Sequence, residues 1–432
     1  MVYQPPVGAR DLLPIDVAQK LWIEDRLQQV FHRWGYHRII TSTLERLDTL
    51  MAGEAIQRTT VLQLQGMEEE ELGLRPELTA SIARAAVTRM AGATYPLRLY
   101  YNANVFRRAQ ETSHNRQQEF YQAGVELLGV GGLLADAEIL LLLVDCLQSL
   151  GLEHCSIILG EAGLTRSLLS PFPAALQPKV RHAIAHLDRV TLETMPLSPG
   201  LRDRALLLLD LRGQPTNVLQ RVAKFDLDDS QRDALNNLKS LIELLQGTPR
   251  TDAINPRRDA IKSPADTLRE RISTPSPIPL VLDLSLIQTL DYYTGIVFEV
   301  VSESPGGVQV LGQGGRYDQL LGLYHPEGQS DPGIGFALQL EHLHQVLAPT
   351  GQLPQQAPVT DWLVVPENLQ AYPDALAHAQ QLRTSTNLIS VELDLGERTA
   401  AEIHDYVRHR RITQIAWVKA GGAVVVETVS QQ

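Results

Sequence analysis

Four short clusters of polar and aromatic residues carry the side chains best suited to binding a small polar ligand. The first spans residues 75–79 (RPELT) and places a carboxylate, Glu77, and a hydroxyl, Thr79, just ahead of a helical segment. Both groups can accept hydrogen bonds from an ammonium ion. A threonine at the start of a helix also commonly caps that helix. On these residues alone, helix capping is the more frequent explanation.

The second cluster begins at residues 106–108 (FRR), which include Arg107, and resumes after a polar loop with a predicted strand over residues 120–128. Because side chains alternate along a strand, Gln122, Gly124 and Glu126 should share one face. A glycine between two polar residues would leave room for a ligand above that face. A solvent-facing strand explains the polar residues equally well, although it would rarely need the glycine.

The third and fourth clusters are residues 290–293 (LDYY) and 314–318 (GGRYD), about one hairpin apart. They supply the phenols of Tyr292, Tyr293 and Tyr317. A carboxylate and several phenols at the head of a strand suit the wall of a pocket. Tyrosines that pack in a core would give the same pattern.

Composition narrows the class of protein. The chain has 432 residues, of which 44% are hydrophobic and 20% charged, which predicts two or three folded domains. Its net charge of −12 argues mildly against a polyanionic partner. Cys146 and Cys155 have neither CxxC nor metal-ligand spacing, so we expect reduced, buried thiols and no metal. The most apolar run, residues 139–144, is far shorter than a membrane span, and no signal peptide is visible, so a cytoplasmic protein is expected.

Periodicity divides the chain into a mixed core, a leucine-rich helical block and a small α/β unit. In the core we predict helices at residues 17–34, 78–90, 133–150 and 336–347, and strands at residues 36–43, 97–106, 120–128, 156–159, 280–286, 295–302 and 308–311. Helices at residues 204–211 and 232–245 belong to the helical block, which closes at the prolines of residues 274–277. After a linker, a β-α-β-α-β-β order is predicted from residue 361 onward.

The clusters, read in order, resemble the histidyl-tRNA synthetase family of class II aminoacyl-tRNA synthetases. Residues 75–79 match the family's Arg-Pro-Glu-x-Thr, and residues 106–107 with 122–126 match its second class motif. Residues 290–293 and 314–318 match its histidine-specific signatures, and residues 335–343 match its third motif.

This resemblance implies an α+β fold, with an antiparallel sheet flanked by helices. The expected domains are a core in two parts (1–163 and 280–348), an inserted helical domain (164–279) and a small α/β domain (359–432) like a shortened anticodon-binding domain.

The resemblance also implies a pocket for free histidine. Glu77, Thr79 and Gln122 would accept hydrogen bonds from the ammonium, while Glu126, Tyr293 and Tyr317 would surround the imidazole. Tyr292 lies nearby, and Arg107 survives from the family's nucleotide-binding arginines.

The family's catalytic positions are changed. Gln288 replaces an arginine that balances charge as the adenylate forms, and losing such a contact typically costs roughly 3–4 kcal/mol of transition-state stabilisation. His342 replaces the third motif's arginine, and Gln339 replaces a glycine that precedes it. Ala109-Gln110 replaces Glu-Arg in the loop of the second motif. Several changes on the ATP side indicate that the synthetase reaction is lost, so no catalytic residue and no cofactor are expected.

A synthetase-like chain with a histidine pocket and no ATP chemistry resembles the regulatory subunits of ATP phosphoribosyltransferase. That resemblance implies a short catalytic partner subunit, L-histidine as inhibitory effector, and a homodimer within a hetero-octamer. It places the chain at the first step of histidine biosynthesis. An active histidyl-tRNA synthetase is the main alternative, and a tRNA or amino-acid sensor is a third. The basic run at residues 408–411 is more typical of a solvated helix end than of a nucleic-acid surface, so no tRNA is expected.

Overall fold

The computed structural model describes residues 5–53, 56–65, 70–108, 117–152, 154–247, 278–286, 292–304, 307–385, 388–396 and 398–429. The chain forms two compact units. The first contains Met1–Asp11 and Gln19–Leu353, and the second contains Leu12–Ala18 and Pro354–Gln432.

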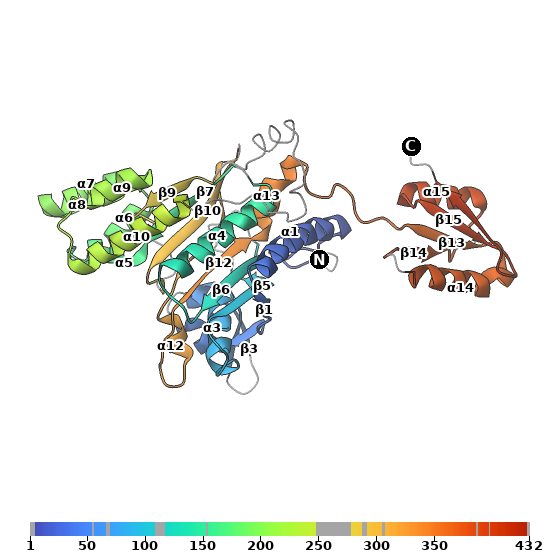
Figure 1. Ribbon diagram of the computed structural model, residues 1–432, viewed down its shortest axis with the longest axis horizontal. Coiled ribbons are helices and arrows are strands. Elements are labelled where there is room, and N and C mark those ends of the chain that lie inside the picture. Colours follow the sequence, from blue (N-terminus) through green and yellow to red (C-terminus); the bar gives the residue numbers. More distant parts are fainter. Residues whose placement is uncertain are drawn as a thin grey trace, which may run out of the picture. The chain divides into compact units, whose positions relative to one another are not determined.

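Among the described residues, the largest sheet has nine strands and belongs to the first unit (Figure 1). From one edge to the other they are β1 (His37–Arg38), β5 (Leu97–Phe106), β6 (Glu119–Leu128), β12 (Gly333–Gln339), β11 (Gly307–Arg316), β10 (Ile296–Ser304), β7 (Cys155–Glu161), β9 (Leu280–Asp283) and β8 (Arg212–Gly213). Every pairing from β5 to β7 is antiparallel, whereas β1 and β9 join in parallel. The predicted antiparallel α+β fold is confirmed.

One face of this sheet is covered by α1 (Pro14–Arg33), α4 (Leu133–Ser149) and α13 (Leu340–Leu347) (Figure 1). The apolar positions of β6, among them Val125 and Leu127, pack there against buried residues of α1 and α4 such as Ile23 and Leu143. The helix predicted at residues 133–150 is confirmed. Its buried residues cover most of its circumference, as its apolar sequence requires.

The other face of the sheet carries α3 (Thr79–Thr88) and α12 (Leu320–Tyr324). Ile82 of α3 and Leu320 of α12 pack there against Leu99 and Val297 of the sheet. Beside them lie α2 (Leu47–Met51), the 3-10 turn η1 (Arg58–Thr60) and a small sheet of strands β2 (Leu44–Arg46), β4 (Glu71–Leu74) and β3 (Leu62–Gln65). This second face holds the cavity described below.

The leucine-rich block forms α5 (Ala162–Leu169), α6 (Gln177–Ala185), α7 (Arg189–Thr194), α8 (Pro199–Leu209), α9 (Pro215–Val222) and α10 (Asp229–Gly247). Both helices predicted there are present, as α8 and α10. Leu208 and Leu241 from this block belong to the same hydrophobic cluster as α4. The predicted proline stop at residues 274–277 lies outside the described residues.

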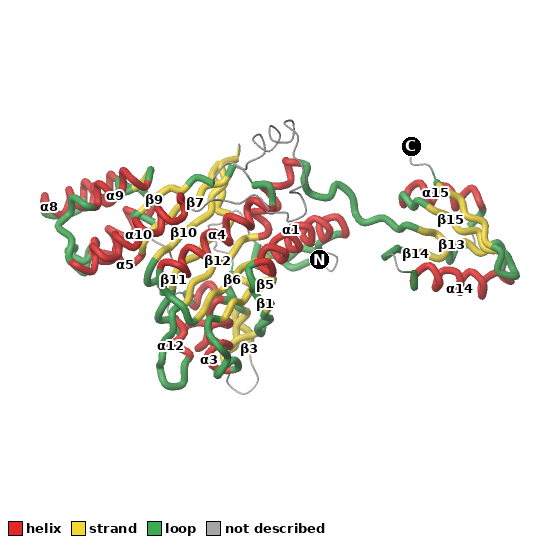
Figure 2. Tube along the Cα trace, in the orientation of Figure 1, coloured by secondary structure: helices red, strands yellow, loops and turns green. Residues whose placement is uncertain are grey.

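Two predictions of local structure are wrong. Only His37–Arg38 forms a strand within residues 36–43, and the chain then runs irregularly to β2. Residues 333–339, which we expected to lead into and begin a helix, form strand β12, and α13 starts only at Leu340 (Figure 2). Strand β12 is buried on both faces, so its sequence has no polar alternation to distinguish it from a buried helix.

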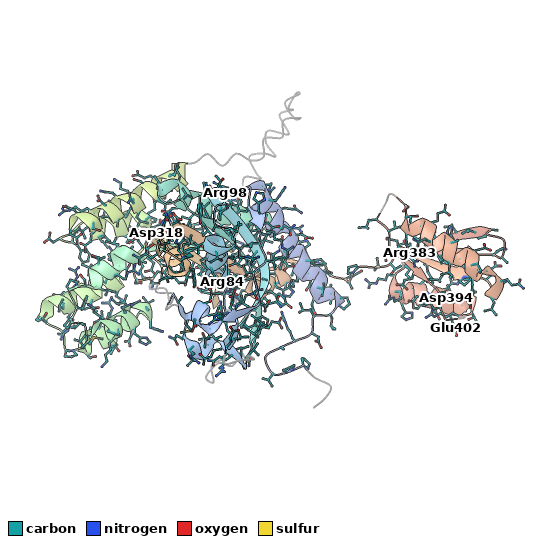
Figure 3. All side chains as sticks on the ribbon, turned by 90° about the horizontal axis from the view of Figure 1, so that it is seen from below. Arg84, Arg98, Asp318, Arg383, Asp394 and Glu402 are labelled. Atoms are coloured by element: carbon teal, nitrogen blue, oxygen red, sulfur yellow. The ribbon has the colours of Figure 1, made fainter. Side chains whose placement is uncertain are left out.

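The second unit contains β13 (Trp362–Pro366), α14 (Tyr372–Arg383), β14 (Val391–Leu393), α15 (Ala400–Arg410), β15 (Gln414–Val418) and β16 (Val424–Thr428). This element order is the one predicted. In the part of this unit that the structure describes, the sheet order is β14-β13-β15-β16, with β16 antiparallel to its neighbour. Helix α15 begins with a capping box formed by Thr399 and Glu402 (Figure 3 labels Glu402).

Candidate functional site

A cavity of about 320 Å³ lies on the α3 side of the large sheet. Its floor follows from the register of the strands, because directly paired residues share a face. Gly124 of β6 pairs with Tyr101 of β5 and with Ala337 of β12, and Glu126 pairs with Gly335. The eight residues predicted to form the site all line this cavity: Glu77, Thr79, Arg107, Gln122, Glu126, Tyr292, Tyr293 and Tyr317.

Glycines on the floor make room for polar side chains of neighbouring strands. A methyl group on Gly335 would collide with the Glu126 carboxylate, and one on Gly124 would come 2.5 Å from the Tyr101 hydroxyl. Gly124 therefore has a different role from the one predicted. The space above it is filled by the backbone carbonyl of Phe336 and the end of the Tyr101 side chain, so these groups, and not a ligand, require the glycine.

Glu126 is the buried acid at the centre of the floor, with 1% of its surface exposed. Tyr317 donates a hydrogen bond to one carboxylate oxygen, and Thr79 Oγ1 donates to the other at 2.7 Å. Burial raises the pKa of Glu126 to about 8, although these two hydrogen bonds oppose that rise. The group can therefore gain or lose a proton near neutral pH.

Glu77 caps helix α3. Its carboxylate accepts hydrogen bonds from the backbone N–H groups of Thr79 (2.5 Å) and Ala80 (2.9 Å). The alternative in which Thr79 caps this helix is wrong, because its hydroxyl bonds Glu126 instead. Burial raises the pKa of Glu77, and the helix N-terminus opposes that rise.

Two polar groups of the lining are available to a ligand. Among the residues that the structure describes, the Gln122 side-chain carbonyl oxygen is buried and has no hydrogen-bond partner. Of the described lining residues, only Arg107 carries a permanent positive charge. Its Nε donates to the carbonyl of Pro76 at 2.9 Å. Burial lowers the pKa of Arg107, and the nearby carboxylate of Glu77 opposes that fall.

Aromatic rings form one wall of the cavity. The ring centroid of Tyr292 lies 4.9 Å from that of Tyr293 and 5.8 Å from that of Tyr317. Tyr101 and Phe336 also line the cavity, and sequence reasoning missed both. Tyr101 lies on a correctly predicted strand. Its place opposite Gly124 depends on the strand register, which the sequence does not reveal.

Further lining residues were missed because they come from a loop and the short turn η1, which carry no periodic sequence pattern: Ile56, Gln57 and Thr60. Arg75, which belongs to the same motif as Glu77, does not line the cavity. Its guanidinium donates to the backbone carbonyls of Thr41 (2.8 Å), Ser42 (3.1 Å) and Asn104 (3.0 Å). This residue therefore holds the chain segments around the cavity together.

The positions predicted to have lost catalytic groups fall in two classes. Gln288 and Ala109-Gln110 lie outside the described residues. His342 lies on α13, where its Nδ1 is 2.7 Å from the carbonyl oxygen of Val310, and it does not line the cavity. Within the described ranges, no group of His, Cys, Asp and Glu side chains could hold a metal ion, and no helix could cross a membrane.

The fold and the cavity define a histidyl-tRNA synthetase-like protein. A family model described as histidyl-tRNA synthetase matches residues 8–343. A crystal structure of a protein from Bacillus halodurans, titled ATP phosphoribosyltransferase regulatory subunit/histidyl-tRNA synthetase, has a TM-score of 0.76 at 24% identity over 97% of this chain and 99% of that one. Histidyl-tRNA synthetase from Nostoc sp. PCC 7120 has a TM-score of 0.71 at 18% identity over 99% and 97% of the two chains.

Curated relatives narrow the assignment. A protein of Trichormus variabilis is 63% identical over 431 residues and 100% of both chains, and one of Gloeothece citriformis is 57% identical over 99% of this chain and 100% of the relative. Both are named ATP phosphoribosyltransferase regulatory subunit. The chain belongs to this family of regulatory subunits.

Proposed function

We propose that this chain is a non-catalytic regulatory subunit that binds L-histidine in the cavity and controls a short catalytic ATP phosphoribosyltransferase subunit. It activates that partner and conveys feedback inhibition at the first step of histidine biosynthesis. The assembly is a cytoplasmic hetero-octamer that contains a homodimer of this chain. Relatives that are 52–63% identical carry the name of such a subunit, which supports this assignment.

The observation that carries the proposed ligand is the unpartnered carbonyl oxygen of Gln122. A buried acceptor without a donor is costly, and a ligand ammonium would satisfy it. Thr79 also lines the cavity and adds a hydroxyl oxygen. Glu77 adds negative charge, although its oxygens already accept hydrogen bonds from the start of α3.

The imidazole and the carboxylate of histidine fit the other lining residues. Glu126 and the Tyr317 hydroxyl can exchange their mutual hydrogen bond for bonds to the two imidazole nitrogens. Tyr292 and Tyr293 provide flat apolar walls for the ring. The guanidinium of Arg107 can pair with the ligand carboxylate.

The same cavity is poorly suited to binding ATP. The nucleotide phosphates require several cations, and Arg107 is the only one among the described lining residues. The ring of His342 is held at the carbonyl of Val310 and does not reach the cavity. We therefore propose that histidine binds without being activated.

Calorimetric titration with L-histidine tests the ligand, on the chain alone and together with the short catalytic subunit. The variant Gln122→Met removes the acceptor and keeps the length of the side chain. Because hydrogen bonds to charged groups contribute about 1.5–3 kcal/mol, affinity should fall by roughly 10- to 150-fold. Glu341→Gln is the control, since this buried carboxylate lies outside the cavity lining. Failure of the wild-type chain to bind histidine in either form would refute the proposal.

Two further assays separate the alternatives. An active synthetase would catalyse histidine-dependent ATP–pyrophosphate exchange, and we expect none. A tRNA sensor would recover tRNA in a pull-down, whereas we expect the short catalytic subunit. In the C-terminal unit, Arg408 and Arg410 are paired with Asp405 and Glu392, which leaves little free positive charge for nucleic acid.

A further inference from the structure

The end of strand β11 and the residues after it serve two cavities. Tyr317 lines the ligand cavity, whereas its neighbours Arg316 and Asp318 line a second cavity of about 540 Å³. The second cavity is lined by residues from the start of α4, from α10, from the start of β10 and from the end of β11. Tyr317 thus faces the cavity with the proposed ligand, while the residues on either side of it face a cavity for which no ligand is proposed.

The Arg316 guanidinium is buried and bonded in several directions. Its Nε donates to Asp136 Oδ1 of α4 at 3.0 Å, and its Nη2 donates to the same oxygen and to the carbonyl of Gly132. Its Nη1 donates to Asp318 Oδ1 at 3.2 Å (Figure 3 labels Asp318). One side chain therefore joins the first turn of α4 to the residues on both sides of Tyr317.

The same network reaches the strand that follows Tyr293. The backbone N–H of Thr294 donates to the carbonyl of Arg316 at 2.7 Å. The Thr294 hydroxyl donates to Asp318 Oδ2 at 3.1 Å and accepts from the Asp318 N–H at 2.9 Å. Thr294 directly follows Tyr293, and Arg316 and Asp318 flank Tyr317. Residues of this network therefore adjoin two of the tyrosines that line the ligand cavity.

We propose that Arg316 is a positioning residue for the ligand cavity. Through Asp136, Asp318 and Thr294 it holds Tyr317 and Tyr293 where they meet the imidazole, and it does so without touching the ligand. This inference rests on the proposed function, because it concerns the affinity of the same cavity for histidine.

The charges around Arg316 determine which variants can test its role. The second cavity is lined by the carboxylates of Asp136, Glu161, Asp233 and Asp318, with Arg316 as the cation among its described residues. The side chains of Arg316 and Asp136 are 8% and 14% exposed. A neutral residue at position 316 would leave buried carboxylates uncompensated and could unfold the chain. Arg316→Lys keeps the charge and loses the forked geometry.

A matched control exists on the same helix. Arg98 of β5 donates to both oxygens of Glu138 of α4, at 2.8 and 2.7 Å, and neither residue lines the ligand cavity (Figure 3 labels Arg98). Arg98→Lys removes the same forked geometry from a pair that also joins a strand to α4. This variant measures how a weaker attachment of α4 to the sheet affects histidine affinity when the residues near Tyr317 are unchanged.

The first measurement is histidine affinity by calorimetry. We expect Arg316→Lys and Thr294→Val each to weaken histidine binding about tenfold. At metal sites, loss of a residue that orients a ligand side chain typically lowers affinity by about 10- to 100-fold, and we expect the lower end of that range here. Arg98→Lys should stay within about twofold of wild type. In a double-mutant cycle with Tyr317→Phe, the effect of Arg316→Lys on affinity should shrink, since it acts through Tyr317.

The second measurement needs no ligand. In protein labelled with 3-fluorotyrosine, the fluorine resonance that Tyr317→Phe removes should shift in Arg316→Lys and stay in place in Arg98→Lys. An unmoved resonance, or an equal loss of affinity in the Arg98→Lys control, would overturn the inference. Absence of histidine binding to the wild-type chain would refute the proposed function, and the fluorine shift would still decide the role of Arg316.

Discussion

Glu126 should make the ligand-free protein less stable as the pH rises, and Glu126→Gln should remove that dependence. Glutamine keeps the size of the side chain and one carbonyl oxygen, which can accept the hydrogen bond of either Tyr317 or Thr79, and its amide NH2 takes the place of the other carboxylate oxygen. It cannot ionise. The comparison therefore isolates the free energy of placing a negative charge on the cavity floor.

The sign follows from proton binding. The ordinary pKa of 4.5 rises to about 8 in the folded chain, mainly because the group is buried. Between those values the folded protein holds a proton that the unfolded chain has released, so the free energy of unfolding falls with increasing pH. The slope is about 1.4 kcal/mol per pH unit, and the whole difference is on the order of 5 kcal/mol, complete above about pH 8.

Urea denaturation of wild type and Glu126→Gln at pH 5, 6, 7 and 8 measures this difference. Other groups titrate in both proteins, so their contributions cancel in the comparison. At each increase in pH, the free energy of unfolding of Glu126→Gln should rise relative to that of wild type. A difference that stays constant over this range, or one that changes in the opposite direction, would refute the assignment of a buried, proton-binding carboxyl to position 126.

Three further predictions concern stability, each measured by chemical denaturation. Gly124→Ala should cost roughly 1–3 kcal/mol, because the added methyl meets the Tyr101 hydroxyl; an unchanged midpoint would contradict the packing of this floor. Arg75→Ala should cost about 3 kcal/mol, since three partly buried carbonyls lose a charged donor, and a loss below 1 kcal/mol would argue against that role. Thr399→Ala should cost about 1 kcal/mol through the capping box of α15, with Thr399→Ser near wild type.

Local sequence patterns were sufficient for several elements of the core. The predicted span of strand β5 agrees with the structure, and those of strand β6 and helix α4 differ from it by one residue each. Strand β12 was missed because burial on both faces removes the periodicity of apolar residues. The length of strand β1 was overestimated, because after the bond from the Ile39 N–H to the Tyr100 carbonyl the chain does not continue the pairing with β5.

The candidate site shows a different limit. The predicted lining residues come together in one cavity because each belongs to a motif that the resemblance identifies. Their hydrogen bonds could not be predicted in the same way. That Glu77 caps α3 while Thr79 reaches Glu126 depends on distances between segments 47 residues apart in the sequence. Likewise, only the strand register places Tyr101 opposite Gly124.

The glycines of the cavity floor have an evolutionary consequence. A side chain at position 335 would meet both the Glu126 carboxylate and the backbone carbonyl of Val125, so this glycine cannot be replaced unless the strands move. At Gly124 a side chain would meet the backbone carbonyl of Phe336 as well as the Tyr101 hydroxyl. A shorter residue at position 126 or 101 would therefore not by itself make room for a side chain at either glycine. Relatives that keep this strand register should therefore keep glycine at both positions, so changes in the shape of the cavity should arise at its other lining residues.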